Sequence, residues 1–307
     1  MKILVSGGAG FIGSHICEKY IKAGHDVCII DNLSTGKIEN IHPEARFFEL
    51  DINSDQVSEL MMQEKFDILC HQAAQVDVRV SVNDPRFDAS TNVLGALNLY
   101  EAALKSGVKK IIFASSGGTI YGDQDYFPAD EQHPLNPCSP YGISKLINEK
   151  YLYYYKYIHG IDFVAFRYAN VYGPRQNPHG EAGVVAIFID RMLNEKQSFI
   201  NGDGKNSRDY VYVEDVANAN LLALGENVSG IYNIGTSVEH DVNFIFQTLN
   251  ELTGGRSPEL HAEAKTGEQR RSVISYKKIN EQLGWQPKTD FLTGLSKTVD
   301  YFKNKLV

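Results

Sequence analysis

A tyrosine and a lysine four residues apart are the side chains of this 307-residue chain best suited to acid–base chemistry. Tyr141 and Lys145 follow Ser139-Pro140, a pair typical of a helix start, so both are expected on one face of a helix. A phenol, with a pKa of about 10, is a poor base at neutral pH, but a nearby ammonium favours the phenolate. The spacing therefore predicts a proton acceptor; the alternative is an exposed tyrosine–lysine pair.

A pair of serines ends the apolar run that precedes this helix. Ser115 and Ser116 close a predicted strand that begins at Lys110. A hydroxyl at this place can donate a hydrogen bond to an oxygen on which charge develops.

A glycine-rich turn follows the first predicted strand and leads into an amphipathic helix that starts with Phe11 and Ile12. Gly7, Gly10 and Gly13 would let the backbone turn tightly, approach a pyrophosphate and pack the helix on the sheet. Asp31 ends the second predicted strand, where a carboxylate can hold the hydroxyls of an adenosine ribose and repel a 2′-phosphate. The pattern predicts NAD as the cofactor rather than NADP.

Three further positions border this predicted cofactor site. Asn32 follows the ribose-binding carboxylate directly, and Asp51-Ile52 follow the third predicted strand. Asp51 is expected either to contact the adenine or to pair with a neighbouring strand end.

The elements that must position these residues alternate along the first half of the chain, with helical patterns between short β-branched strands. This order predicts an α/β fold, a Rossmann-like doubly wound parallel sheet. We expect an NAD-binding domain over residues 1–170, with a segment near 209–234 returning to it, and a smaller C-terminal lobe over 171–307. The predicted strands are Lys2–Ser6, Asp26–Ile30, Arg46–Leu50, Asp67–His71, Lys110–Ser115 and Asp162–Tyr168.

The composition argues against several other classes of protein. A net charge of −8, with lysines and arginines spread along the chain, gives no footprint for nucleic acid. The nine histidines form no metal-ligand cluster, so no metal is expected. No run approaches the roughly 18 apolar residues of a membrane helix. The four cysteines lie far apart, which favours reduced thiols in a cytoplasmic protein.

Together these motifs resemble the extended short-chain dehydrogenase/reductase family, and within it the UDP-hexose 4-epimerases, along nearly the whole chain. The resemblance implies a catalytic triad of Ser116, Tyr141 and Lys145, with Ser115 as the alternate because the following glycine loop varies in length. It also implies that Ala73, Ala74, Asn92 and Tyr168 line the NAD site. The segments that carry it are residues 7–13, 71–77, 113–122, 167–175 and 207–211, together with Asn92.

The resemblance extends to the binding of a UDP-sugar. It implies that Asn170 and Arg208 hold the diphosphate; a salt bridge to Asp209 is the alternative for the arginine. Residues 265–271 resemble the family's second nucleotide clamp, although Lys265 stands where many relatives have arginine.

Because Lys265 replaces that arginine, the resemblance leaves open whether Lys265, Arg270 or Arg271 contacts the phosphate. Glu268 fits a contact to the uridine ribose. Ser272 occupies a position where epimerases restricted to plain hexoses carry a tyrosine. A serine there leaves room for an N-acetyl group, unless it only continues a surface strand.

The reaction that the resemblance implies is epimerisation at carbon 4, interconverting UDP-glucose and UDP-galactose through a 4-keto sugar. Related dehydratases typically carry acidic residues just after the active-site hydroxyl, where this chain has Gly117-Gly118. The alternatives are a UDP-uronate epimerase or decarboxylase, a dehydratase, a reductase, or a non-catalytic NAD-sensing protein.

A homodimer through a four-helix bundle is also implied. One predicted helix runs from Pro85 to near Gly107 and the other from Ser139-Pro140 through Tyr157. They carry more apolar and tyrosine side chains than one sheet face can bury, including Leu97, Leu152, Tyr153 and Tyr155. The alternative is an intrachain core with some exposed tyrosines.

Overall fold

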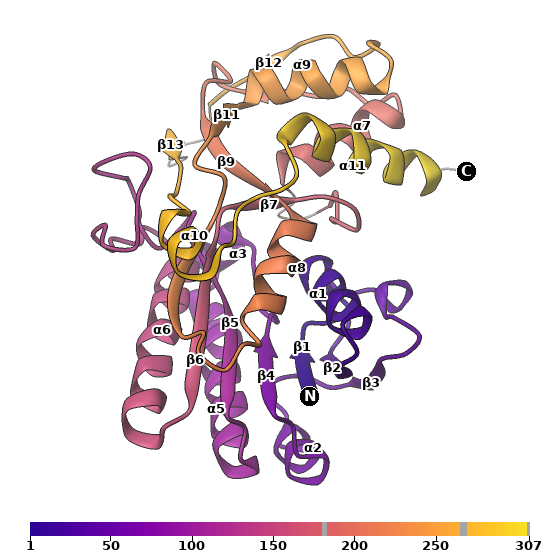
Figure 1. Ribbon diagram of the computed structural model, residues 1–307. Coiled ribbons are helices and arrows are strands. Elements are labelled where there is room, and N and C mark those ends of the chain that lie inside the picture. Colours follow the sequence, from indigo (N-terminus) through magenta and orange to yellow (C-terminus); the bar gives the residue numbers. More distant parts are fainter. Residues whose placement is uncertain (180–182, 265–268, 306–307) are drawn as a thin grey trace.

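A seven-stranded parallel sheet forms the centre of the larger part of the molecule (Figure 1). The computed structural model describes residues 1–179, 183–264 and 269–305. The strand order is β10-β6-β5-β4-β1-β2-β3, so the chain runs outward from β1 in both directions, and the predicted doubly wound sheet is confirmed. The strands are β1 (Lys2–Ser6), β2 (Asp26–Asp31), β3 (Arg46–Glu49), β4 (Ile68–His71), β5 (Lys110–Ser116), β6 (Asp162–Tyr168) and β10 (Gly230–Ile234).

Helices cover both faces of this sheet. Along β1, Ile3 and Val5 pack into the core that includes Ile16, whereas Leu4 packs into the opposite core with Leu60. Because both faces are buried, these strands are runs of apolar residues rather than polar–apolar alternations. One face carries α1 (Phe11–Lys22) and α8 (Val213–Leu222), and the other carries α2 (Gln56–Glu64), α5 (Gly95–Ser106) and α6 (Pro140–His159).

The six strands predicted from the sequence are confirmed, each end within one residue of the observed one. The single helix expected from Pro85 to Gly107 is instead divided into α4 (Pro85–Ala89), a π-helical segment (Ser90–Leu94) and α5. The wider turn carries Asn92, whose side chain bonds to the backbone of Gln75. The run ends as expected, because Gly107 adopts a φ of 86° that favours glycine.

Most of the remaining elements form a smaller part of the molecule, at the top of Figure 1. Within it, β9 pairs with β7, β11 and β13, and the buried rings of Tyr172, Phe188 and Phe246 pack in one apolar cluster. None of the helices in the described residues is long and apolar enough to cross a membrane. The elements of this part are β7 (Asn170–Tyr172), α7 (Val184–Leu193), β8 (Ile200–Asn201), β9 (Ser207–Tyr212), β11 (Glu239–Asp241), α9 (Val242–Thr253), β12 (His261–Ala262), β13 (Arg271–Ser272) and α11 (Phe291–Lys305). The larger part also includes α3 (Val78–Asn83), α10 (Lys277–Leu283) and a 3₁₀ turn at Ile38–Asn40.

Candidate active site

The predicted catalytic tyrosine and lysine share one face of α6, near its first turn. The Ser139 hydroxyl caps the helix by accepting a hydrogen bond from the Gly142 amide at 3.1 Å. Gly142 is required there, since a Cβ would lie 2.7 Å from the carbonyl oxygen of Thr119. The Lys145 ammonium lies 5.5 Å from the centre of the Tyr141 ring. The capped turn therefore holds the phenol and the ammonium beside each other.

Burial dominates the electrostatics of this pair. It lowers the pKa of Lys145 to about 8, while the Asp88 carboxylate acts in the opposite direction. The ammonium donates to the Ala114 carbonyl oxygen at 2.8 Å. Burial also raises the pKa of the Tyr141 phenol, and Asp88 raises it further. Burial and Asp88 thus favour the neutral phenol, and positive charge beside Tyr141 favours the phenolate.

The two serines at the end of β5 have different surroundings. Ser115 is buried, and its hydroxyl donates to Glu149 Oε1 at 2.7 Å. Glu149 also forms a buried ion pair with Arg167 at 2.7 Å. Ser116, the last residue of the strand, is half-buried. Successive strand side chains point to opposite faces, so the Ser116 side chain points away from this polar cluster.

The glycine turn between β1 and α1 is packed too tightly for side chains at two of its three positions. Gly7 has a φ of 73°, and a Cβ there would lie 2.6 Å from the Ala73 amide nitrogen. A Cβ at Gly13 would lie 2.1 Å from the carbonyl oxygen of Gly7. At Gly10 the same carbonyl, at 3.2 Å, is the sole neighbour within 4 Å among the described residues. The turn therefore leaves open backbone at the start of α1, which fits the pyrophosphate of a dinucleotide.

The carboxylate that the sequence predicts to bind a ribose, Asp31, lies at the end of β2 beside the glycine turn. Asp31 accepts hydrogen bonds from the amides of Ala9, at 3.0 Å, and Leu33, at 2.9 Å. These bonds hold it beside the glycine turn. Burial raises the pKa of Asp31, and the two amides oppose that effect.

The neighbouring candidates contact one another. Asn32 Nδ2 donates to Asp51 Oδ2 at 2.7 Å, so Asp51 has the strand-end partner that the sequence left open. The side chain of Ile52 is buried against Gly95 at the start of α5.

The other candidates for the cofactor site lie where neighbouring strands end. Ala73 and Ala74 follow β4, and Tyr168 ends β6 with its hydroxyl 2.8 Å from Asn220 Nδ2. Asn92 anchors the segment after β4 through the backbone of Gln75. The carboxyl edge of a parallel sheet is where doubly wound folds bind ligands. The candidates from β1, β2, β4, β5 and β6 therefore converge on one edge.

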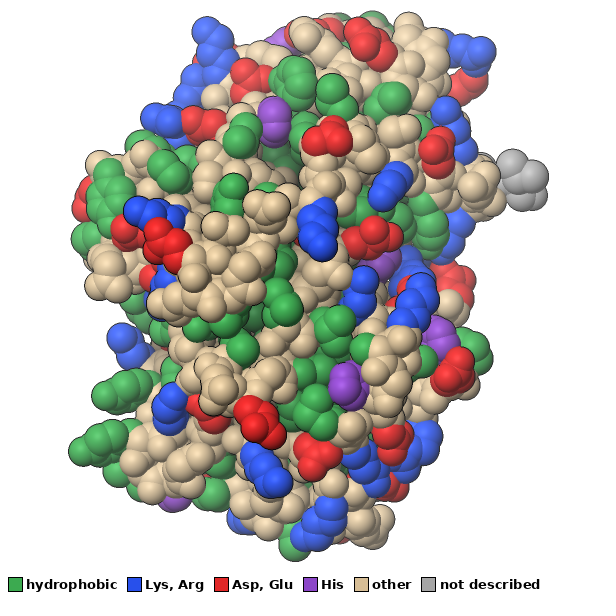
Figure 2. Space-filling model, in the orientation of Figure 1, with side chains coloured by type: hydrophobic (Ala, Val, Ile, Leu, Met, Phe, Trp, Pro, Cys, Tyr) green, Lys and Arg blue, Asp and Glu red, His purple; other side chains and the backbone are tan. Residues whose placement is uncertain are grey.

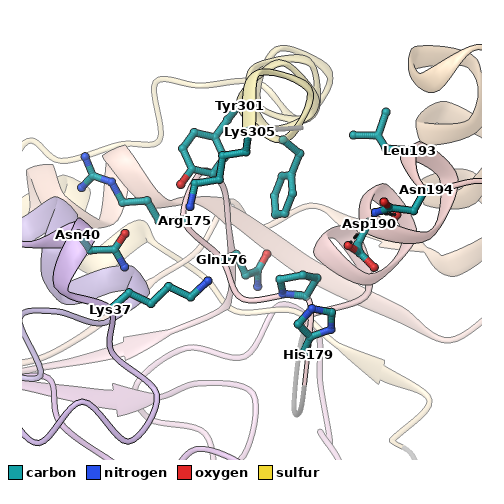
Figure 3. Close-up of a pocket in the computed structure, with 12 residues that line it drawn as sticks. Lys37, Asn40, Arg175, Gln176, His179, Asp190, Leu193, Asn194, Tyr301 and Lys305 are labelled. Carbon is teal, nitrogen blue, oxygen red and sulfur yellow. Dashed lines mark hydrogen bonds between the residues drawn. The ribbon is translucent and has the colours of Figure 1, made fainter. Parts of the chain in front are cut away.

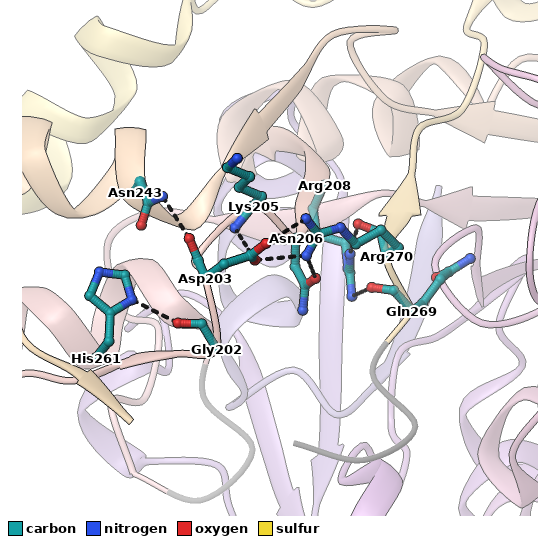
Figure 4. A network of polar contacts seen from close by, with 9 residues as sticks. All are labelled: Gly202, Asp203, Lys205, Asn206, Arg208, Asn243, His261, Gln269 and Arg270. Atoms are coloured by element: carbon teal, nitrogen blue, oxygen red, sulfur yellow. Dashed lines mark hydrogen bonds and ion pairs between the residues drawn. The ribbon is translucent and has the colours of Figure 1, made fainter. Parts of the chain in front are cut away.

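Arg208 lies on β9 and contacts the described part of the predicted second clamp (Figure 4). Its guanidinium donates to the carbonyl oxygens of Ser207 at 2.8 Å and Gln269 at 2.6 Å. The Asp209 carboxylate instead accepts hydrogen bonds from the amide and the hydroxyl of Thr236, at 2.9 and 2.6 Å. The alternative of an Arg208–Asp209 salt bridge is therefore wrong. Asn170 on β7 donates to the Asp209 carbonyl oxygen at 3.3 Å.

Both arginines of the predicted clamp have carboxylate partners. Arg270 forms a two-pronged ion pair with Asp203 at 2.7 and 2.8 Å (Figure 4). Arg271 pairs with Glu239 and lies 3.9 Å from the centre of the Phe127 ring. Ser272 is buried on β13 and pairs in register with Arg208. The other two residues of the clamp, Lys265 and Glu268, lie outside the described residues.

Two features near the site were missed by the sequence analysis. One is the buried Glu149–Arg167 pair, and the other is Asp88, which contacts Ser144 on α6. The available signal was the position of Ser144, a polar residue between Tyr141 and Lys145 on the same helix. Among the described residues, no group of three His, Cys, Asp or Glu side chains is arranged to hold a metal ion.

A separate hollow lies between the loop near Ile38–Asn40 and helices α7 and α11 (Figure 3). Lys37, Arg175 and Lys305 border it, but Arg175 pairs with Glu18 and Lys305 with Glu39. None of the site residues predicted from the sequence lines it.

Comparisons with known proteins agree with this geometry. The model of the NAD dependent epimerase/dehydratase family matches residues 3–235. A putative UDP-glucose 4-epimerase of Methanocaldococcus jannaschii is 47% identical over 302 residues, 98% of each chain. The solved UDP-glucose 4-epimerase of Thermotoga maritima with UDP-glucose is 46% identical, with a TM-score of 0.98 over 100% of each chain. That of Thermus thermophilus, in complex with NAD, is 44% identical, with a TM-score of 0.94 over 99% of each chain.

Proposed function

Because the chain belongs to the NAD-dependent epimerase/dehydratase family, we propose that it is a UDP-glucose 4-epimerase, which interconverts UDP-glucose and UDP-galactose. The observation that carries this proposal is the Tyr141–Lys145 pair, held on one face of α6 at the carboxyl edge of a sheet whose first turn fits a dinucleotide. The cofactor is NAD.

The chemistry assigned to the chain is proton transfer at the sugar 4-hydroxyl. NAD bound in the site would supply the redox chemistry, as acceptor and then donor of the hydride at carbon 4. Tyr141 accepts the hydroxyl proton as the hydride leaves and gives it back at the end of the reaction. Lys145 favours the phenolate by its charge, and the Ser116 hydroxyl donates to the oxygen of the 4-keto sugar. Carbon 4 is planar in the ketone, so return of hydrogen to the opposite face yields the epimer.

Elimination of water is a poorer match to these residues. It requires an acid and a base beyond the tyrosine, and the positions after Ser116 are Gly117 and Gly118. Simple oxidation and reduction at one carbon needs only the groups already assigned.

We assign the binding residues as follows. The NAD site comprises Gly7, Gly10, Phe11, Ile12, Gly13, Asp31, Asn32, Asp51, Ile52, Ala73, Ala74, Asn92, Tyr141, Lys145 and Tyr168. Arg208 grips the substrate diphosphate, because a guanidinium can meet two phosphate oxygens at once, and Asn170 assists it. We assign Lys265, Glu268, Arg271 and Ser272 to the second side of the nucleotide-sugar, and a substrate lobe to residues 171–307.

We also propose that the protein is a cytoplasmic homodimer. An apolar stripe runs along α6 at helical spacing: Ile143, Ile147, Tyr151, Tyr154 and Ile158. Ile158 is 56% exposed, and a shallow hollow is lined by Ile147, Lys150, Tyr151 and Tyr154. Hydrophobic side chains project at the edge of the molecule where α6 lies (Figure 2). Of the side chains named from the sequence, Leu152 and Tyr155 belong to the intrachain core, whereas Tyr153 is exposed.

The function is tested by supplying UDP-galactose and oxidising any UDP-glucose formed with a coupled dehydrogenase. The wild type is expected to form UDP-glucose, and Tyr141→Phe is expected to lower kcat by about 10³-fold or more while NAD stays bound. Tyr153→Phe, an exposed tyrosine on the same helix, is the matched control and should turn over normally. Near wild-type activity in Tyr141→Phe would contradict the catalytic assignment.

A further inference from the structure

A buried carboxylate that the proposed reaction does not use lies beside the catalytic pair. Asp88, on α4, is fully buried. Its Oδ2 atom accepts the Ser144 hydroxyl at 2.6 Å. Ser144 lies on α6 directly before Lys145 and one turn after Tyr141. The carboxylate therefore contacts the helical turn on which the reaction depends.

The other oxygen of Asp88 is held by two amides whose orientation the backbone fixes. Oδ1 accepts from Asn92 Nδ2 at 2.9 Å and from Gln75 Nε2 at 3.1 Å. Asn92 Oδ1 accepts the Gln75 amide and Gln75 Oε1 accepts the Asp77 amide, so each side-chain nitrogen must face Asp88. All three partners donate, which matches an ionised carboxylate, since that group only accepts.

The charged and titratable groups around Asp88 come from several elements. From α6, Lys145 and Tyr141 both feel its charge, which raises the pKa of each, although burial is the larger influence on both. From β4, His71 faces Lys145 with a pKa lowered to about 3, chiefly by burial, and is therefore neutral. From the turn before α3, Asp77 pairs with Arg79, whose side chain is 60% exposed. The buried ammonium of Lys145 is thus the cation that offsets Asp88.

We propose that Asp88 is a positioning residue for the reaction, one that fixes the turn carrying Tyr141 and Lys145 against the segment after β4 and places its carboxylate charge beside that pair. This inference rests on the proposed function for its role in turnover. The geometry does not depend on the proposed function: the Asp88 carboxylate is hydrogen-bonded to Ser144 on α6, to Asn92 and to Gln75.

The test separates the charge of Asp88 from its hydrogen bond. Asp88→Asn removes the charge and keeps the size, while Ser144→Ala removes the shared hydrogen bond and keeps the charge. Both are titrated with NAD bound by NMR of ¹³Cζ-labelled tyrosine, with the Tyr141 signal assigned by its loss in Tyr141→Phe. We expect the pKa of Tyr141 to fall by about one unit in Asp88→Asn and to stay unchanged in Ser144→Ala. The acidic limb of the kcat profile should move to lower pH by the same amount, in Asp88→Asn alone.

Two results would overturn the proposal: an unmoved Tyr141 titration in Asp88→Asn, or an equal shift in both variants, which would make the effect one of geometry and not of charge. Should Asp88→Asn fail to fold, Asp88→Ser gives the same reading of lost charge. If the wild type had no epimerase activity but the pKa of Tyr141 still fell in Asp88→Asn, the proposed function would be rejected and the role of Asp88 would stand.

Discussion

At the scale of single residues, Lys145 combines a functional need with a cost to stability. Its pKa is lowered to about 8 by burial, below the value of about 10.4 for an exposed lysine. The unfolded chain therefore binds this proton more tightly than the folded protein does. The free-energy cost of burying the charge is greatest below the folded-state pKa of about 8, and it disappears as the pH rises toward the pKa of the lysine in the unfolded chain.

This gives a prediction for Lys145→Met, which cannot titrate. The free energy of unfolding of the wild type, relative to that of the variant, should rise by about 2 kcal/mol between about pH 7 and about pH 9.5 in the cofactor-free protein. Urea unfolding of both proteins at the two pH values measures the difference. A constant difference would mean that Lys145 is not the titrating group.

Ser272 carries a prediction about substrate breadth. It is buried on β13 beside Arg208, so its side chain does not merely continue a surface strand. A serine leaves room for an N-acetyl group at sugar carbon 2, and we expect UDP-N-acetylglucosamine and UDP-N-acetylgalactosamine to be interconverted as well. Ser272→Tyr should lower kcat/KM for the N-acetylated substrates by about tenfold or more, roughly 1.4 kcal/mol, relative to the plain hexoses.

The ratio of the two kcat/KM values is the measurement, and turnover of the plain hexoses is the internal control for folding. Ser272→Ala keeps the space and should keep the ratio. A ratio that Ser272→Tyr leaves unchanged would show that this position does not gate the pocket.

The role of a residue could be predicted from the sequence where it depends on near neighbours, and could not where it depends on partners far along the chain. The spacing of Tyr141 and Lys145 and the pattern of Gly7, Gly10 and Gly13 can be recognised within a few residues of sequence. The different surroundings of Ser115 and Ser116 could not be recognised in this way, because they depend on a hydrogen bond from Ser115 to Glu149, 34 residues away. One partner of Arg208, the carbonyl oxygen of Gln269, lies 61 residues away in the sequence.

At the scale of elements, the start of α6 determines the position of Tyr141, the proposed proton acceptor. Ser139 supplies the capping oxygen two residues before Tyr141, with Pro140 in the first turn. Ser139→Ala should lower the free energy of unfolding by about 1 kcal/mol and reduce kcat, because the frayed turn carries the phenol. Ser139→Asp keeps a capping oxygen and should restore most of both. Equal stability of Ser139→Ala and wild type would show that the cap is not needed.

The helix between Pro85 and Gly107 shows where patterns of elements lose information. Its ends follow from a proline at the first turn and a glycine in the left-handed region, and both were predictable. The π-helical turn at Ser90–Leu94 was not, because it accompanies bonds between Asn92 and Gln75 that no periodicity encodes. The pairing of β10 with β6 joins distant segments; the sequence led us to expect a return of the chain near residues 209–234 but not the strand beside which it lies.

At the scale of the whole molecule, the face of α6 that turns away from the sheet remains exposed in the single chain. Tyr154 is 46% and Ile158 56% exposed, and both belong to one apolar stripe. A contiguous apolar face of this kind is typical of a protein–protein interface, and a C₂ dimer would bury the stripe against its own copy.

We therefore expect light scattering at micromolar concentration to give about twice the chain mass of 34.3 kDa. Replacing Tyr154 and Ile158 together by glutamate should yield the 34.3 kDa monomer, because each charge would be buried without a partner in the dimer. Leu292→Glu is the matched control, since Leu292 on α11 is 54% exposed and lies outside the stripe, and it should leave the dimer intact. A wild type that scatters as a monomer would reject the dimer and leave the stripe as an exposed surface of a single chain.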